Sequence, residues 1–578
     1  MPLNLFRKLC VRSSKSLIST AHPFPSLPAE LWYLIASFIP FSEFCAAKLY
    51  TLNHSLFSFY LEEKYRKLTL EYVYDNDFMN DRLSKKIGQY QVNLKILSDA
   101  VIDLMPSCNR KSPVVPMATR ILKLQIRPPN CYFCSSPSST ERVKRRLQAR
   151  LSQVVEILGP LRPRDATRRA LAFREYTVAS LSRLNNLTSM KLDWSPPDRS
   201  DYQPSSPVNI SLLAGLAAAW ISSKNTLVNL SLVFRAAYLL DTALPTVELT
   251  SLRKFELTIS PQYDLFDEEP PLLDDSLTSS RELLIRFLSN HQSTLQTLHL
   301  MLPSSRFAEG VLDKIPFLSS LTSLSLSFTL YKNTLVLSSL PRFLQRQSAQ
   351  LQEFTFRLYT KLDPALLGSW YNPVPANLEW WISQPFVQVD FPQLDKLTLR
   401  LDTPFLFSYA AKFATRIRTL SIAYNETSQV ETREPARTYL LYSEIRDLLG
   451  VLTRTTVPNS LQELAICTKK FTPGLLRLLG HSLPELRTLR IQCRTFDTVD
   501  DYNPNLEYDE SPLPYTEFST VVFPDWKLNH IFLSQQYPFQ IGAWKAEKEE
   551  FCAALLHALP NVKYFNGVTR GEDWMGHW

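Results

Sequence analysis

Few residues in this chain of 578 have the types and spacing that catalysis or metal binding requires. Cys131 and Cys134 form one C-x-x-C pair, but a structural zinc site needs about four ligands and no second pair lies nearby. No two of the eight histidines are four residues apart, and neither H-E-x-x-H nor G-x-S-x-G occurs. Asp500 and Asp501 lie in an acidic, proline-containing stretch that is typical of a loop. We therefore expect a protein that is not an enzyme, with no catalytic residue, no metal and no cofactor.

The scarcity of glycine excludes the common nucleotide-binding loops. Only 12 residues are glycine, roughly 2% against a usual level of about 7%. Such loops need backbone that approaches phosphate without a side chain. Neither G-x-G-x-x-G nor G-x-x-x-x-G-K is present, because the nearest spacing, Gly571 to Gly576, is followed by His577.

The net charge of +8 is concentrated in two segments. Residues 1–29 carry +4 and residues 141–175 carry +6, which leaves −2 for the rest of the chain. The basic segment 142–174 lacks interleaved aromatic residues for base stacking over most of its length, so nucleic acid is not an expected partner. A membrane is not expected either, because the longest apolar run, residues 212–221, is shorter than the roughly 18 residues of a span.

The first element that the sequence predicts is a short helix after Leu27 and Pro28. Proline is favoured in the first turn of a helix, and Pro40 ends the helix because proline disfavours helical backbone in the residue before it. Ser42 is placed to cap a second helix and Asn53 a third. Three short helices cannot bury their apolar residues alone, so some of these must meet the rest of the chain or a partner. The first helix has its apolar residues in one stripe: Leu31, Leu34, Ile35, Phe38 and Ile39.

Residues 27–44, with the pattern L-P-x-E-L-x-x-x-I-x-x-F-I-P-F-x-E-F, resemble the first half of an F-box. In that family the motif docks the Skp adaptor of cullin-RING ubiquitin ligases. The resemblance covers residues 27 to about 68, and residues 65–70 are similar to the segment that follows many fungal F-boxes. The sequence departs from the family pattern at residues 43–44, 50–51 and 54. The resemblance implies the following adaptor-binding residues: Leu27, Pro28, Leu31, Ile35, Phe38, Ile39, Phe41, Phe44 and Leu49.

A six-residue frame, L-x-x-L-x-L with conservative substitutions, dominates the rest of the chain. Ten copies keep one strict internal spacing, which chance does not readily produce even in a leucine-rich chain. The copies are Leu187/Met190/Leu192, Leu227/Leu230/Leu232, Leu252/Phe255/Leu257, Leu295/Leu298/Leu300, Leu321/Leu324/Leu326, Leu351/Phe354/Phe356, Leu394/Leu397/Leu399, Ile417/Leu420/Ile422, Leu461/Leu464/Ile466 and Leu486/Leu489/Ile491.

Each frame predicts one short strand of a parallel sheet. Its last two apolar positions are two residues apart and therefore lie on one face of a strand. Residues 121–126 form a weaker early copy, and helices are predicted between copies, for example at 280–288 and 473–479. Such units bury their apolar edges only against neighbours, so their stability comes from stacking. The pattern resembles a leucine-rich-repeat solenoid, with intervals of 23 to 44 residues between frames; a plain α/β domain with a mixed sheet is the alternative.

The residues between the inward-facing leucines are expected on the concave surface of the sheet, which repeat proteins use for recognition. This row holds Lys191, Asp193, Asn229, Ser231, Lys254, Glu256, His299, Ser325, Thr355, Arg357, Lys396, Thr398, Arg400, Glu463, Arg490 and Gln492. Within it, we predict substrate-binding residues and a basic stripe that favours an acidic partner. The predicted substrate-binding residues are His299, Arg357, Lys396, Arg400 and Arg490.

The predicted fold class is α/β, with a short three-helix F-box-like module followed by an irregular leucine-rich-repeat solenoid. The expected divisions are a disordered leader at 1–24, the helical module at 25–70, a linker with degenerate first repeats and a basic helix at 71–185, the solenoid at 186–495, and an acidic loop with a C-terminal cap at 496–578. A helix is predicted in this cap near residues 544–556, and a last partial strand at 562–565.

The resemblances imply a substrate-recognition adaptor of an SCF-type ubiquitin ligase. Its partners would be the Skp adaptor, through it a cullin, and a protein substrate, in the cytoplasm, the nucleus or both. One alternative is a repeat scaffold whose helical cap is intramolecular, in which case Leu31, Ile35 and Phe38 would pack under the repeats. Another is a mitochondrial protein, because the basic leader has no acidic residue.

Overall fold

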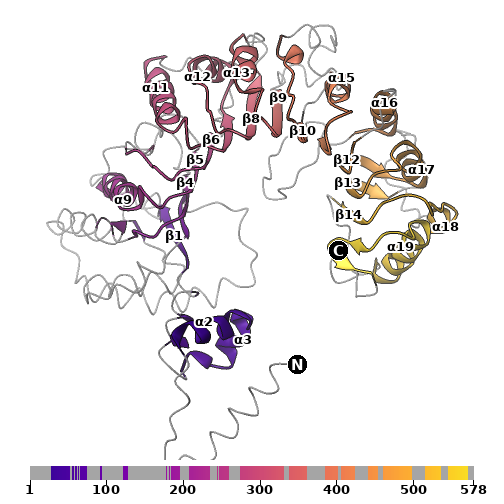
Figure 1. The fold of residues 1–578 in the computed structure, drawn as a ribbon, viewed down its shortest axis with the longest axis horizontal. Coiled ribbons are helices and arrows are strands. Elements are labelled where there is room, and N and C mark those ends of the chain that lie inside the picture. The colour runs from indigo at the N-terminus through magenta and orange to yellow at the C-terminus, as the bar shows by residue number, and fades with distance from the viewer. Residues whose placement is uncertain are drawn as a thin grey trace, which may run out of the picture.

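The computed structural model of the chain describes residues 28–51, 66–74, 121–127, 184–194, 207–234, 247–259, 274–330, 338–360, 385–400, 405–422, 440–453, 460–496, 515–535 and 544–570, together with a few shorter stretches. Leu27, the C-x-x-C pair and the basic segment 142–174 lie outside the described residues. The described strands form one open sheet of 16 strands. In Figure 1 this sheet follows an arc, with strands on the inner side and helices on the outer side. The predicted mixed α/β class is confirmed.

The strands follow one another in space as they do in sequence from β3 to β16, and β1 lies between β2 and β3. Neighbouring strands pair in parallel except at the two ends, where β1 pairs antiparallel with β2 and β15 with β16. The strands are β1 (Lys67–Tyr74), β2 (Val92–Asn93), β3 (Ile121–Arg127), β4 (Ser189–Trp194), β5 (Asn229–Phe234), β6 (Lys254–Ile259), β7 (Thr297–Leu302), β8 (Ser323–Leu330), β9 (Glu353–Thr360), β10 (Lys396–Arg400), β11 (Thr419–Ile422), β12 (Glu463–Phe471), β13 (Thr488–Phe496), β14 (His530–Gln535), β15 (Tyr564–Phe565) and β16 (Val568–Thr569).

Helices connect many successive strands and cover the outer side of the arc (Figure 1). The predicted helices at 280–288, 473–479 and 544–556 are confirmed as parts of α11, α17 and α19. The helices of the arc are α9 (Pro207–Ser223), α11 (Asp274–Asn290), α12 (Ser305–Leu312), α13 (Ser339–Gln347), η6 (Pro385–Gln388), α15 (Phe405–Lys412), α16 (Tyr442–Thr453), α17 (Pro473–Ser482), α18 (Tyr515–Ser519) and α19 (Trp544–Ala558). Within the described residues, none of the helices is both long and apolar enough to cross a membrane.

The repeated frame explains both the strands and the core. In all ten copies the three apolar positions are at most 2% exposed, and the strands pair so that equivalent positions lie side by side, as Phe255, Leu298 and Leu324 do. The carbonyl before one strand accepts two N–H groups from the next, as Arg253 does from Gln296 and Thr297 at 2.8 and 2.9 Å. The buried backbone is therefore satisfied wherever repeats meet.

The sheet extends beyond residues 186–495 at both ends. Before them lie β1 and the predicted early copy, which forms β3. After them, Leu528, Ile531 and Leu533 form a further frame, each at most 3% exposed. The region expected to hold a C-terminal cap continues the same sheet through β14, β15 and β16.

The N-terminal residues form a separate small helical module with α2 (Ala29–Ser37), α3 (Phe41–Ala46) and a short 3-10 turn, η1 (Leu49–Thr51). Its core comprises Ala36, Phe44, Leu49 and Leu56, which belong to a different hydrophobic cluster from the core of the arc. Pro40 occupies the N-cap of α3, so the expected capping by Ser42 is not observed. In Figure 1, α2 and α3 lie outside the arc, beyond its β1 end.

Buried polar side chains at the ends of two outer helices tie neighbouring repeats together. Gln347, at the end of α13, accepts from the Leu318 amide at 3.2 Å and donates to the Pro316 carbonyl at 3.1 Å. His291, just after α11, accepts from the Leu249 amide at 3.0 Å through Nε2. Each of these side chains thus binds backbone groups of a turn that precedes a strand of the sheet.

The second hydrogen bond of His291 fixes its tautomer. Its Nδ1 donates to the Phe287 carbonyl at 2.7 Å, so Nε2 is the unprotonated acceptor. Burial lowers the pKa of His291, although the Phe287 carbonyl and the charge of Glu248 act in the opposite direction. The imidazole is therefore held neutral in the folded chain.

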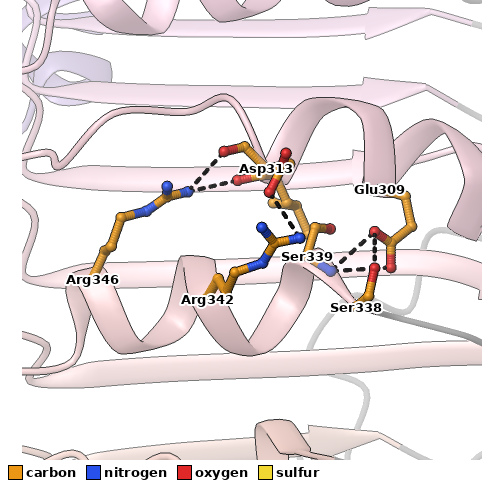
Figure 2. Close-up of polar contacts among 7 residues, drawn as sticks. Glu309, Asp313, Ser338, Ser339, Arg342 and Arg346 are labelled. Atoms are coloured by element: carbon orange, nitrogen blue, oxygen red, sulfur yellow. Dashed lines mark hydrogen bonds and ion pairs between the residues drawn. The ribbon is translucent and has the colours of Figure 1, made fainter.

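Helices α12 and α13 are joined by charged contacts at both ends (Figure 2). The Glu309 carboxylate accepts from the Ser339 amide at 3.0 Å, at the positive end of α13. Arg346 donates to the Leu312 carbonyl at 2.9 Å, at the negative end of α12. These contacts hold α12 and α13 side by side on the outer side of the arc.

Candidate functional site

The first candidate site is the solvent-facing side of α2. Leu31, Leu34 and Phe38 are 44%, 53% and 79% exposed, and their spacing of three to four residues places them on one helical face. The opposite side of α2 packs into the module through Ala36, which is fully buried, and Trp32. Clustered exposed apolar residues of this size mark interaction surfaces more often than isolated ones do.

The structure separates the predicted adaptor-binding residues into two groups. Pro28, Leu31 and Phe38 are exposed, and Ile35 is half-buried. Ile39 and Phe41 are half-buried and pack against the core of the module. The surface formed by Pro28, Leu31, Leu34, Ile35 and Phe38 is called the α2 face below.

Phe44 and Leu49 require a correction, because they are 0% and 6% exposed. The Phe44 ring meets that of Phe59 edge-on, with centroids 5.4 Å apart. A partner cannot contact either side chain without opening the module. Their role is therefore to hold α2 and α3 together, and the sequence could not separate this from contact because both kinds of residue are apolar.

The second candidate site is the concave face of the sheet. The strand register places Ser231, Glu256 and His299 side by side on β5, β6 and β7. The same row continues through Ser325 and Thr355 on β8 and β9. The predicted row of outward residues is therefore confirmed as a continuous surface across these strands.

On the β6–β7 part of this face, the charges of neighbouring side chains neutralise one another. Lys254 Nζ lies 2.8 Å from Glu256 Oε1. Burial acts to raise the pKa of Glu256, but hydrogen bonds from Lys254 and Ser231 and nearby positive charge hold that pKa below its ordinary value. Burial lowers the pKa of His299; Glu256 opposes this effect, whereas Arg357 and Lys254 add to it. His299 is thus a neutral group at neutral pH, and it lies within the positive field of Arg357.

Arg490 does not belong to a free basic stripe, contrary to the sequence prediction. Its Nε donates to Glu463 Oε1 at 2.7 Å, and its guanidinium lies 4.5 Å from the centroid of the Phe532 ring. His530 and Tyr564, on the neighbouring strands β14 and β15, stack with centroids 4.5 Å apart. These aromatic residues were not predicted, because the frame that forms β14 was not identified from the sequence.

Arg357 and Arg400 are brought together, as neighbours in register on β9 and β10. Lys396 lies four residues before Arg400 on the same strand, in register with Glu353. Two basic residues directly across a strand pair repel each other. The Arg400 side chain lies outside the described residues, so the structure establishes the register of these two positions and no more.

No group of three or more metal-binding side chains occurs in the part of the chain that the structure describes. Neither a protein-family model nor a curated protein matches this chain. The functional argument therefore depends on the geometry of the α2 face and the concave face.

Proposed function

We propose that this chain is the substrate-recognition adaptor of an SCF-type ubiquitin ligase, in which an F-box-like module docks the Skp adaptor and a leucine-rich-repeat-like solenoid binds the target. The chain itself would catalyse no bond chemistry. Its contribution would be proximity, because it would hold a target lysine near a charged conjugating enzyme.

The exposure of the α2 face is the observation that carries this proposal. Full burial of an exposed apolar side chain releases about 1.5–3 kcal/mol. Phe38 would gain most of this on docking, and Leu31 and Leu34, which are already about half-buried, would gain less. Association costs remove part of the gain. Pro28, Leu31 and Phe38 belong to the pattern that resembles an F-box and are exposed on this face. The repeated frame and its continuous concave surface support the second half of the proposal.

The alternative function is a repeat scaffold whose helical module is an intramolecular cap. It requires Leu31, Ile35 and Phe38 to pack under the repeats. The exposure of Leu31 and Phe38, and the separation of the two hydrophobic clusters among the described residues, favour the adaptor.

The test is co-purification of the full chain with the Skp adaptor. Phe38→Asp and Leu31→Asp should each abolish capture, because each would place an unpaired carboxylate in an apolar interface. Phe317→Asp is the matched control, since Phe317 is a 49% exposed aromatic residue on the repeats, and this variant should bind like the wild type. Equal adaptor capture by folded Phe38→Asp and wild-type chains would refute the proposal.

A further inference from the structure

Aromatic side chains gather on the concave face near the C-terminal end of the arc, where Figure 1 shows β14 on the inner side. His530 and Tyr564 are neighbours in register on β14 and β15, and their rings stack with centroids 4.5 Å apart and an angle of 6° between the planes. Tyr564 is 36% exposed, and His530 and Phe532 are half-buried. These three residues are called the C-terminal aromatic surface below. Aromatic residues that stay accessible on a recognition face are typical of the centres of protein interfaces.

The residues beside the stacked rings are small. Thr488 on β13 is in register with His530, and Thr569 on β16 is in register with Tyr564. Neither threonine has a ring or a long chain that could stack on the pair. Within the described residues, the outer face of each ring therefore has no stacking partner.

Two cationic residues flank the same row. Arg487 directly precedes Thr488, and Lys563 directly precedes Tyr564. The backbone places Asn529 between them, because the Arg487 carbonyl accepts from the Asn529 amide at 2.9 Å and the Asn529 carbonyl accepts from the Lys563 amide at 2.8 Å. Both cationic side chains are exposed, and in the part of the chain that the structure describes neither forms an ion pair.

The other charged side chains near this row are already paired. Arg490 Nε donates to Glu463 Oε1 at 2.7 Å, and Lys527 Nζ lies 2.8 Å from Glu485 Oε2. These pairs are close to neutral, so the excess of positive charge remains at Arg487 and Lys563. Charge complementarity therefore favours an acidic ligand, and the stacked rings favour an aromatic one.

We infer that the C-terminal aromatic surface, together with Arg487 and Lys563, binds an extended segment of the target protein in which an aromatic residue lies between two acidic residues. The aromatic side chain packs on the His530–Tyr564 pair in an offset-stacked or edge-to-face arrangement. The two carboxylates pair with Arg487 and Lys563. The strands β13 and β15 are two strand spacings apart, about 10 Å, and three residues of extended chain span about the same distance.

A nucleic acid fits this surface less well, although bases also stack on aromatic rings. Nucleic-acid binding neutralises about 6–10 phosphates in well-studied cases, whereas two unpaired cations flank this row. The carboxylate of Glu463 is partly exposed beside the row and would repel a phosphate. A protein segment with two carboxylates matches the charge more closely.

This inference rests on the proposed function, in which the concave face receives the target, and it names the chemistry of that target. Its assay needs no Skp adaptor, whereas the adaptor assay needs no target peptide. Failure of one assay is therefore distinguishable from failure of the other.

The experiment measures the fluorescence anisotropy of a labelled 12-residue peptide, Glu-Phe-Ser-Glu in a glycine and serine background, as it binds the full chain. We expect at least a fivefold loss of affinity with Tyr564→Ala and with Lys563→Glu. Tyr564→Phe keeps the ring and should bind like the wild type. Two matched controls should stay within twofold of the wild type: Phe317→Ala, at an exposed aromatic residue elsewhere on the repeats, and Arg477→Glu, at an exposed arginine of α17.

The peptide is varied in the same way. Replacement of its phenylalanine by serine, or of its glutamates by glutamine, should each weaken binding at least fivefold. Every protein variant is first compared with the wild type by thermal unfolding. The inference would be overturned by wild-type affinity in a folded Tyr564→Ala or Lys563→Glu variant, by an equal loss in the two controls, by equal binding of the altered peptides, or by tighter binding of single-stranded RNA at Tyr564.

Discussion

Replacement of Gln347 by leucine should loosen one junction between repeats without disturbing the rest of the arc. Gln347 is fully buried, and its amide holds both the Leu318 amide and the Pro316 carbonyl. Leucine has a similar volume but leaves both backbone groups without this partner. Because each of the two orphaned groups costs about 1–3 kcal/mol, we expect a loss of about 2–6 kcal/mol at this junction.

Hydrogen exchange at the Leu318 amide measures this loss directly. At about 1.4 kcal/mol per factor of ten, its exchange should accelerate by at least roughly 30-fold, and by up to roughly 20,000-fold. Gln345→Leu is the matched control, because Gln345 is an exposed residue of the same helix and its replacement should leave the exchange unchanged. If Gln347→Leu left the Leu318 amide as protected as in the control, the polar tie between repeats would be refuted.

Two further predictions concern stability. Gly450→Ala should raise the free energy of unfolding in urea by about 0.5–1 kcal/mol, because an added Cβ meets no atom within 4 Å. Gly480→Ala should lower the free energy of unfolding, because its Cβ would lie 2.9 Å from the Phe523 ring. Equal effects of the two substitutions would contradict this packing. Acidification below about pH 6.5, the ordinary pKa of histidine, should destabilise the repeat that contains α11. The reason is that folding lowers the pKa of His291, and a protonated Nε2 cannot accept the hydrogen bond from the Leu249 amide. The loss should grow as the pH falls through the folded pKa, and His291→Gln should be less sensitive in urea unfolding across this range.

The strands were predictable because the spacing of the apolar residues alone determines where they form. In a frame such as Leu295, Leu298 and Leu300, the spacing alone places all three side chains inward, and all three are fully buried. Stacking of identical units then fixes the register, since each apolar edge can be covered only by the next. Leu528, Ile531 and Leu533 fit the same frame and form β14, which the prediction from the sequence did not include.

The contacts between repeats were not predictable from the pattern. Gln347 meets Leu318 across 29 residues of chain, and this contact depends on how the intervening turn returns to the sheet. The sequence likewise could not show that Glu463 would neutralise Arg490. Charged partners on neighbouring strands are separated by variable insertions, so their pairing follows only from the register.

The division of the helical module into core and surface was predicted in part. The apolar stripe of α2 was expected, and Leu31 and Phe38 are exposed within it. Phe44 and Leu49 are apolar residues of the same motif, yet they lie inside the module. A short amphipathic segment does not specify which of its apolar residues face their own core, because that depends on the angle at which α3 crosses α2.

The most direct test of the proposed adaptor is hydroxyl-radical footprinting of the native Phe38 side chain, with and without the Skp adaptor. In the free chain, Phe38 should oxidise readily because it is 79% exposed, and Phe317, at 49%, serves as the internal reference. If the adaptor covers the α2 face, it should lower the oxidation of Phe38 several-fold and leave that of Phe317 unchanged. Oxidation of Phe38 at the same rate in both samples, or its protection already in the free chain, would contradict the account.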